Sequence, residues 1–298
     1  MIWRDHIFQI AFLLLTIAAT APGIAAAQDR DAFLAQQTKN CAGCALTGTS
    51  LAQRDLTGAD LSGADLRGAV FSRTILRGAK LSGANLAGVN LKRRDLTAAD
   101  LSGANLAGAT LHRAILRGAN LSGANLTDAN LNVAVLTAAK LERASLVQAL
   151  LFQVDAGGAD FRGAKLGGVL MGSARLIGAV LDDADLTFAD LWEARLTNAS
   201  VRQATLTEAN LHGASLLRAD LRTVSAERAI FVAATMRNAN LSGAVLKGAD
   251  LFQADLVEAD LSGADLRDAR LAAAKLFNAN QADAKFGGAI MPDNTVHP

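Results

Sequence analysis

The chain has 298 residues, of which 51% are hydrophobic, and its 29 Lys and Arg against 28 Asp and Glu leave a formal net charge of +1. A charge this close to balance argues against a strongly basic nucleic-acid binder and against a strongly acidic mimic of nucleic acid. Tyr is absent and there are only three Pro, a bias that favours a repeat architecture over an ordinary globular domain.

The first 27 residues have the layout of a secretory signal peptide. Arg4 precedes an apolar run over residues 7–17, and the three alanines at 25–27 fit an A-x-A cleavage site. The apolar run is too short to span a bilayer comfortably. We therefore predict cleavage before Gln28, a periplasmic or secreted protein, and no membrane span after cleavage. An uncleaved N-terminal anchor is the alternative.

From residue 46 to residue 286, every fifth position belongs to one unbroken register. Leu fills 39 of these 49 positions, and Ala fills 40 of the positions two residues earlier. In an α-helix, residues five apart point in different directions, and in a flat strand they alternate between the two faces. The leucines share one environment only if the chain turns a corner every five residues.

The residues that flank each leucine are suited to such a corner. Pairs such as Ser62-Gly63 and Ser82-Gly83 follow the leucine, and Asp or Asn often precedes it. Gly permits a positive φ in a tight turn, and Asp and Asn suit an outward polar position beside it. We predict that each pentad is one short side of a coil, with Leu and the Ala two residues earlier both pointing inward.

The phrases GADLSGADLRGA and GANLSGANLTDANL resemble the A-(D/N)-L-x-x motif of pentapeptide repeat proteins. The resemblance implies an all-β fold, a right-handed quadrilateral β-helix with four pentads per coil and about twelve coils. Together with the signal peptide, it divides the chain into a signal peptide (1–27), an N-terminal cap (28–45), the β-helix (46–290), to which the resemblance applies, and a C-terminal tail (291–298).

The two ends of the rod differ in sequence. After the signal peptide, the stretch DRDAFLAQQTKN is predicted to form a short helical cap, with Asp29 or Asp31 as N-cap and with Phe33 and Leu34 over the first coil. No helix is predicted for the tail. An uncovered last coil would leave an open edge, which predicts a homodimer through the C-terminal coil.

Two arginines interrupt the inward alanines. Arg54 and Arg94 occupy Ala positions on one face, two coils apart, with Thr74 between them. Because burying an unpaired guanidinium is costly, we expect the chain to bulge locally and lead both guanidinium groups outward. A binding pocket at this place is the alternative.

Cys41 and Cys44 form a C-x-x-C pair at two inward positions of the repeat. In an oxidising compartment they are expected to form a disulfide beside the cap, with free buried thiols as the alternative. A thioredoxin-like redox site would need a βαβ setting, which the sequence lacks.

Residues with catalytic chemistry are not grouped in the sequence. His112 and His212 share a column but lie five coils apart, so they cannot bind one metal ion, and the Asp ladders follow from the repeat itself. No motif for a nucleophile elbow or a phosphate loop occurs. We predict that the protein is not an enzyme and holds no cofactor or metal.

One column of outward positions is rich in apolar side chains and is predicted to bind a protein partner, because exposed aromatic and aliphatic residues mark such surfaces. Its members are Phe152, Trp192, His212, Val232 and Phe252. The leading functional hypothesis is an exported, non-catalytic scaffold with a protein partner that the sequence does not name, and nucleic acid is not expected as a partner. The resemblance also implies a DNA-mimic regulator or protector of a topoisomerase, and a thiol–disulfide role for Cys41 and Cys44 is the third hypothesis.

Overall fold

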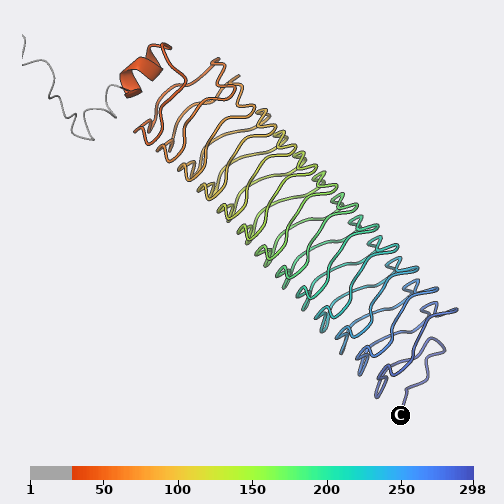
Figure 1. Ribbon diagram of the computed structural model, residues 1–298. Coiled ribbons are helices and arrows are strands. Elements are labelled where there is room, and N and C mark those ends of the chain that lie inside the picture. Colours follow the sequence, from red (N-terminus) through yellow and green to blue (C-terminus); the bar gives the residue numbers. More distant parts are fainter. Residues whose placement is uncertain (1–28) are drawn as a thin grey trace, which may run out of the picture.

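The computed structural model describes residues 29–298, so the predicted signal peptide and its cleavage site lie outside the described residues. The described chain is a rod of stacked coils that follow one another in sequence order, with a short helix at one end and the C-terminus at the other (Figure 1). This arrangement is the solenoid that the five-residue period predicts.

Each coil contains four pentads, because every parallel bridge joins residues twenty apart. The parallel bridges run from Asn40↔Asp60 to Arg270↔Ile290. They lie at the position before each inward leucine, so the Asp and Asn positions of the repeat form the rungs between coils. We call side A the side whose inward residues are 51, 71, 91 and every twentieth residue onward to 291.

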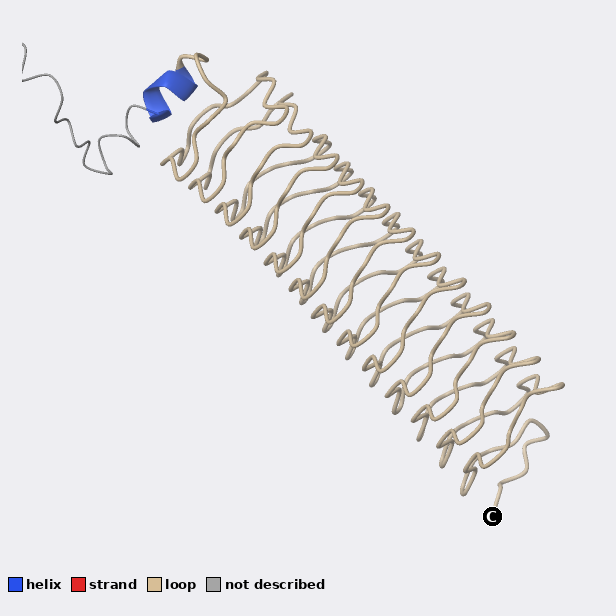
Figure 2. Cartoon of the chain, in the orientation of Figure 1, coloured by secondary structure: helices blue, strands red, loops and turns tan. Residues whose placement is uncertain are grey.

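The prediction of an all-β fold needs a correction. The bridges of the described rod are isolated single residues, and the chain between them is turn, so Figure 2 shows no strand in the part of the chain that it describes. A corner every five residues leaves room for one bridged residue per side. The first bridge is at Asn40, so the coils begin six residues before the predicted start at 46.

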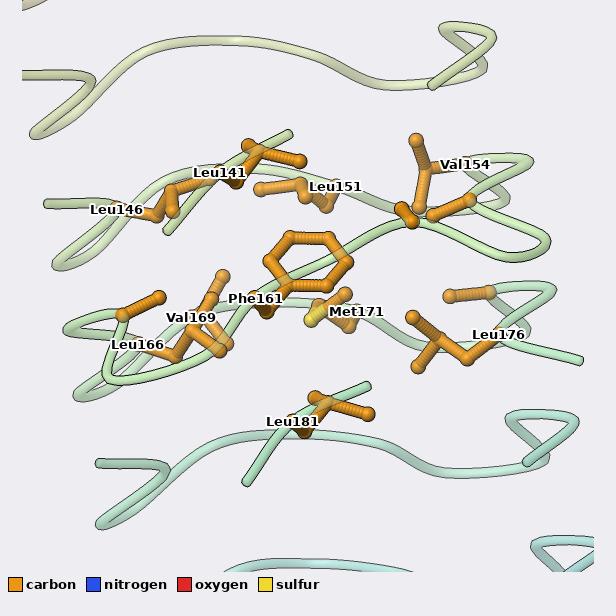
Figure 3. Close-up of a cluster of buried hydrophobic side chains, with 14 of the residues drawn as sticks. Leu141, Leu146, Leu151, Val154, Phe161, Leu166, Val169, Met171, Leu176 and Leu181 are labelled. Atoms are coloured by element: carbon orange, nitrogen blue, oxygen red, sulfur yellow. The ribbon is translucent and has the colours of Figure 1, made fainter. Parts of the chain in front are cut away.

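The core is a continuous column of the inward leucines and alanines. Leu141, Phe161 and Met171 are fully buried and point into the interior of the coils (Figure 3). Ala at the position two residues earlier is also buried along almost the whole rod. Each fully buried leucine contributes about 1.5–3 kcal/mol relative to an exposed one, so the stacking of coils carries most of the stability.

The corners use the left-handed backbone conformation. Every fifth residue from 43 to 288 has a positive φ, whether it is Gly63 (φ 64°) or a residue with a side chain such as Ala98 (φ 56°). The Asp or Asn three residues before it closes the turn: the Ser62 amide donates to Asp60 Oδ1 at 3.1 Å. This Asx geometry explains the choice of Asp and Asn before the leucine.

The N-terminal end is covered by a helix over residues 29–34. Phe33 is fully buried against the first coil, and the Arg54 guanidinium lies 4.3 Å from its ring centroid and donates to its carbonyl oxygen. The expectation that Arg54 leads outward into solvent was therefore wrong. Its cost of burial is offset by this hydrogen bond and by the aromatic ring.

The C-terminal end is covered only in part. The tail turns back through an antiparallel bridge between Ile290 and Val296, and the His297 ring packs on Phe286 with 5.7 Å between ring centroids. On the other sides of the last coil, the amides of Leu276 and Gln281 lack the inter-coil acceptor that the inward residues from 76 to 271 all have. Gln281 is exposed, because the inward column ends there.

Candidate protein-binding surface

The predicted column of outward residues lies on side A, but its members are not equally exposed. Phe152 and His212 are exposed, whereas Trp192, Val232 and Phe252 are half-buried. The expectation that all five face solvent was therefore wrong for three of them. The reason is that large side chains in such a column cover their neighbours.

The aromatic pair at the N-terminal end of the column spans three coils. The rings of Phe152 and Trp192 are stacked with 6.1 Å between centroids, although their backbones lie two coils apart. Gly172 lies in the coil between them, and a Cβ built there would lie 2.1 Å from the indole Nε1. The absence of a side chain at Gly172 therefore lets the indole lie down against the backbone.

Two aliphatic residues extend this pair on side A. Leu150 and Leu170 bridge each other in adjacent coils, and Leu170 is 46% exposed. Together with Phe152 and Trp192 they form what we call the aromatic patch. Sequence reasoning missed the leucines because they occupy Asp and Asn positions of the repeat, where a search confined to the column after the inward residue does not look.

The other end of the column is separated from the aromatic patch. Asp190, Asn210 and His212 lie between the patch and Phe252, and the Phe252 ring is covered by the Arg270 guanidinium at 4.3 Å. Phe252 is thus engaged within the rod by a cation–π contact. The five predicted residues do not form one site. The aromatic patch is the continuous part of the apolar surface on side A.

One buried carboxylate holds neighbouring coils together on the side of the rod opposite side A. Asp182 is 7% exposed, and its carboxylate accepts hydrogen bonds from the Ser200 hydroxyl and from the Arg202 backbone amide and guanidinium, the last two at 3.0 Å. Burial by itself raises the pKa of Asp182, but the hydrogen bonds and charge of Arg202 outweigh it and hold this pKa below its usual range. Asp182 therefore has a structural role, which is to hold two adjacent coils together.

The other carboxylates follow the repeat. Asp265 pairs with Arg267, two residues later, and the guanidinium hydrogen bonds lower the pKa of Asp265 to about 2. Asp65 with Arg67 and Asp220 with Arg222 repeat the same pairing. Each of these ion pairs joins residues two apart across one corner, so the pairs are explained by the turns of the solenoid.

The remaining sequence predictions are placed as follows. Cys41 and Cys44 are buried and joined by a disulfide. His112 and His212 lie on side A, five coils apart. Within residues 29–298, no cluster of three or more His, Cys, Asp or Glu side chains could hold a metal ion, and no helix is long and apolar enough to cross a membrane.

The chain belongs to the pentapeptide repeat family. The family model for pentapeptide repeats matches it repeatedly between residues 55 and 291. This match and the twenty-residue coils agree on a solenoid of stacked pentapeptide coils. No curated protein matches the chain in sequence.

Among solved structures, the chain is similar to three pentapeptide repeat proteins of different origin. HetL, involved in heterocyst differentiation regulation in the cyanobacterium Nostoc, is 33% identical over 91% of this chain and 98% of its own, with a TM-score of 0.41. The plasmid-mediated fluoroquinolone resistance protein QnrB1 is 22% identical over 61% of this chain and 85% of its own (TM-score 0.30). A protein of the Arabidopsis thaliana thylakoid lumen is 28% identical over 43% and 65% (TM-score 0.15).

Proposed function

We propose that the protein is an exported, non-catalytic scaffold that binds a protein partner through the aromatic patch on side A. The observation that carries this proposal is the stacked pair of Phe152 and Trp192, held over Gly172 and flanked by the exposed Leu170. Aromatic anchors on a rigid backbone are typical of the centres of protein interfaces, because little side-chain entropy remains to be lost on binding.

The rigidity of the rod supports a scaffold. The patch is built on bridged coils whose inter-coil hydrogen bonds are complete from residue 96 to residue 275. Partners of such a surface meet a preformed shape, and binding then requires no folding of the scaffold. A solenoid also allows a long contact along its side.

The test of the proposal is a pair of variants compared for binding. Trp192→Ser removes the indole from the patch, and Phe188→Ser removes an aromatic ring from a corner outside it; Phe188 is 60% exposed. A photo-crosslinker placed at Leu170 should capture one defined partner with the original chain and with Phe188→Ser, and lose it with Trp192→Ser. Equal capture by all three chains, with unchanged thermal stability, would contradict the proposal.

Export is tested separately from binding. A reporter that is active only outside the cytosol is fused to the C-terminus of the full chain, and the mature N-terminus is sequenced. Processing before Gln28 with an active reporter supports export. A full-length chain with an inactive reporter would contradict export and would favour the topoisomerase regulator.

The uneven charge of the rod weighs against DNA mimicry. Between residues 49 and 133, side A carries no Asp or Glu, whereas it carries Arg73, Lys92, Arg93 and Arg113. A duplex mimic needs a continuous acidic surface along its sides. Side A cannot provide one over its N-terminal half.

We also propose a homodimer through the last coil. Its support is the row of amides at Leu276 and Gln281 without inter-coil acceptors, beside Phe277, which is 71% exposed. Open edges of this kind pair with other chains. Light scattering of the original chain should give twice the monomer mass, and Phe277→Asp should give the monomer mass; a monomeric original chain would contradict the proposal.

A further inference from the structure

The ladder of hydrogen bonds between coils is interrupted at one place on side A. Between residues 56 and 275, the regular inter-coil bonds are present everywhere except between residues 68–74 and 87–95. The amides of Phe71, Arg73 and Asn90 lack their usual acceptors there, and Val70↔Asn90 is the one bridge absent from the series that runs from residue 40 to residue 290. The two coils are therefore separated locally.

The separation opens a groove of about 520 Å³ to solvent. Its floor consists of turn and bridge residues of the two coils, including Gly68, Val70 and Asn90, and its rim carries Lys92, Arg93 and Arg94. In a regular coil, the amides of Phe71 and Asn90 point across the space between coils, so here they point into the groove. Cationic side chains and backbone donors thus converge on one opening.

The cations of this groove have no carboxylate partner. None of Lys92, Arg93 and Arg94 is in an ion pair, and the Arg94 guanidinium donates only to the Lys92 carbonyl. The neighbouring carboxylates, Asp55 and Asp95, lie on the next side and are paired with Lys39 and Arg77. This differs from the pentads in which an arginine is neutralised by the Asp two residues before it.

We propose that the groove binds a phosphate ester of a small polyol, such as a sugar phosphate. A phosphate group suits the cluster because guanidinium groups and free amides are strong donors to its oxygens. The carbonyl oxygens of Ala69 and Asn90 also lose their inter-coil donors at the interruption, and they can accept from hydroxyl groups of the same ligand. The volume is in the range of small-molecule sites.

The arrangement is difficult to explain by the stability of the rod. Three stacked arginines, Arg73, Arg93 and Arg113, occupy the positive-φ corner in successive coils, at φ values from 58° to 61°. Gly is favoured in this conformation, and like charges one coil apart, about 4.8 Å, repel each other. The loss of several hydrogen bonds adds to the cost. A bound anion would reduce the repulsion between the arginines and would accept hydrogen bonds from the free amides.

The experiment uses a variant that retains the turn chemistry of the repeat. Lys92→Ser/Arg93→Gly creates the Ser-Gly corner already present at Ser62-Gly63, so the rod should fold. Arg218→Gly/Lys247→Ser removes the same two charges from corresponding corner positions elsewhere on the rod. Titration calorimetry is carried out on all three proteins with glucose 6-phosphate, glucose and inorganic phosphate.

Glucose 6-phosphate should bind the original chain and the control variant more tightly than inorganic phosphate does, and glucose alone should not bind. The groove variant should bind at least roughly tenfold more weakly. Hydrogen exchange at residues 68–74 and 87–95 should slow when the ligand is added. Equal weakening in both variants, no binding of glucose 6-phosphate, or unchanged exchange in these segments would overturn the proposal.

A lipid headgroup is the other source of the same chemistry, and vesicles distinguish it. Phosphatidylcholine vesicles with and without phosphatidylglycerol are sedimented with the original chain and with the groove variant. The proposal predicts that glucose 6-phosphate binds whether or not vesicles are present. Binding to phosphatidylglycerol vesicles that depends on Lys92 and Arg93, without binding of glucose 6-phosphate, would assign the groove to a membrane surface instead.

Discussion

Two stretches of the rod share one backbone plan and differ in what they present to solvent. Near Phe71, the coils are separated, the rim is cationic and several amides lack acceptors. Between Phe161, on the side opposite side A, and Trp192, on side A, the coils are fully bridged, and side A presents an apolar and aromatic surface. We call this part of the rod the closed stretch. The inward phenylalanine is common to both stretches, so the ring by itself does not separate coils. The two stretches differ at the position two residues before the inward leucine, where Thr74 and Arg94 replace Ala. We call this position the corner column.

The corner explains the difference physically. Ala at the position two residues before the inward leucine is small enough to leave room for the leucine, and it is buried in the closed stretch at Ala164 and Ala184. Thr74 is buried as well, but its hydroxyl donates to the Leu51 carbonyl at 2.7 Å, and Arg94 extends past the corner to the rim. Larger and polar corner residues are thus accommodated by separating the coils.

The largest expected effect concerns the buried rings. Phe161→Ala should lower the free energy of unfolding by about 3–5 kcal/mol, because the closed coils cannot collapse around the cavity. Phe71→Ala should cost less, since the separated coils beside it have space to relax. Urea denaturation of both variants measures the difference, and equal losses would show that the two stretches are packed alike.

The second effect is the closure of the groove. Thr74→Ala/Arg94→Ala restores the alanine corner, and we expect the coils to come together and regain their hydrogen bonds, each worth about 0.5–1.5 kcal/mol. Hydrogen exchange at Phe71 and Asn90 should slow to the rate found in the closed stretch. Ala164→Thr/Ala184→Arg is the reverse control and should open the closed stretch. Unchanged exchange in both variants would show that the residues of the corner column do not cause the interruption of the inter-coil hydrogen bonds.

The third effect is the pH dependence contributed by Asp182, which holds two coils together in the closed stretch. Because its pKa in the fold lies below the ordinary value of 3.8, Asp182 contributes stability above that pH, and this contribution is lost as the pH falls through the lowered pKa. Asp182→Asn should therefore cost about 1–2 kcal/mol at pH 7. At pH 2 its stability should approach that of the original chain, and a loss that does not change with pH would contradict this origin.

The smallest effect tests how the aromatic patch is held. In Gly172→Ala the new Cβ would overlap the indole, so Trp192 must swing outward while the backbone stays in place. We expect a red shift of tryptophan fluorescence and a loss of stability of about 1 kcal/mol or less. Gly103→Ala is the control for the substitution itself, because a Cβ there meets no neighbour and only the positive φ is strained. Unchanged fluorescence in Gly172→Ala would show that the indole does not depend on this glycine.

Much of the fold could be predicted from the five-residue period alone. A repeat without insertions places each leucine in the same environment, so the inward column and the corners follow from it, and the resemblance supplied four pentads per coil. Cys41 and Cys44 could be assigned to inward positions in the same way. The period could not show how large side chains in one column share space, which is why Trp192 was expected in solvent and lies half-buried over Gly172.

The sequence by itself determined which residues point inward, because periodicity acts at every pentad and is independent of the neighbouring coils. Only the tertiary structure decided how adjacent coils meet. Arg54 and Arg94 are equivalent in the repeat, yet Arg54 lies on the ring of Phe33 in the cap and Arg94 lines an open groove. Their positions differ because Arg54 has the helical cap beside it and Arg94 has a further coil. The sequence of a single pentad does not specify which of these neighbours it has.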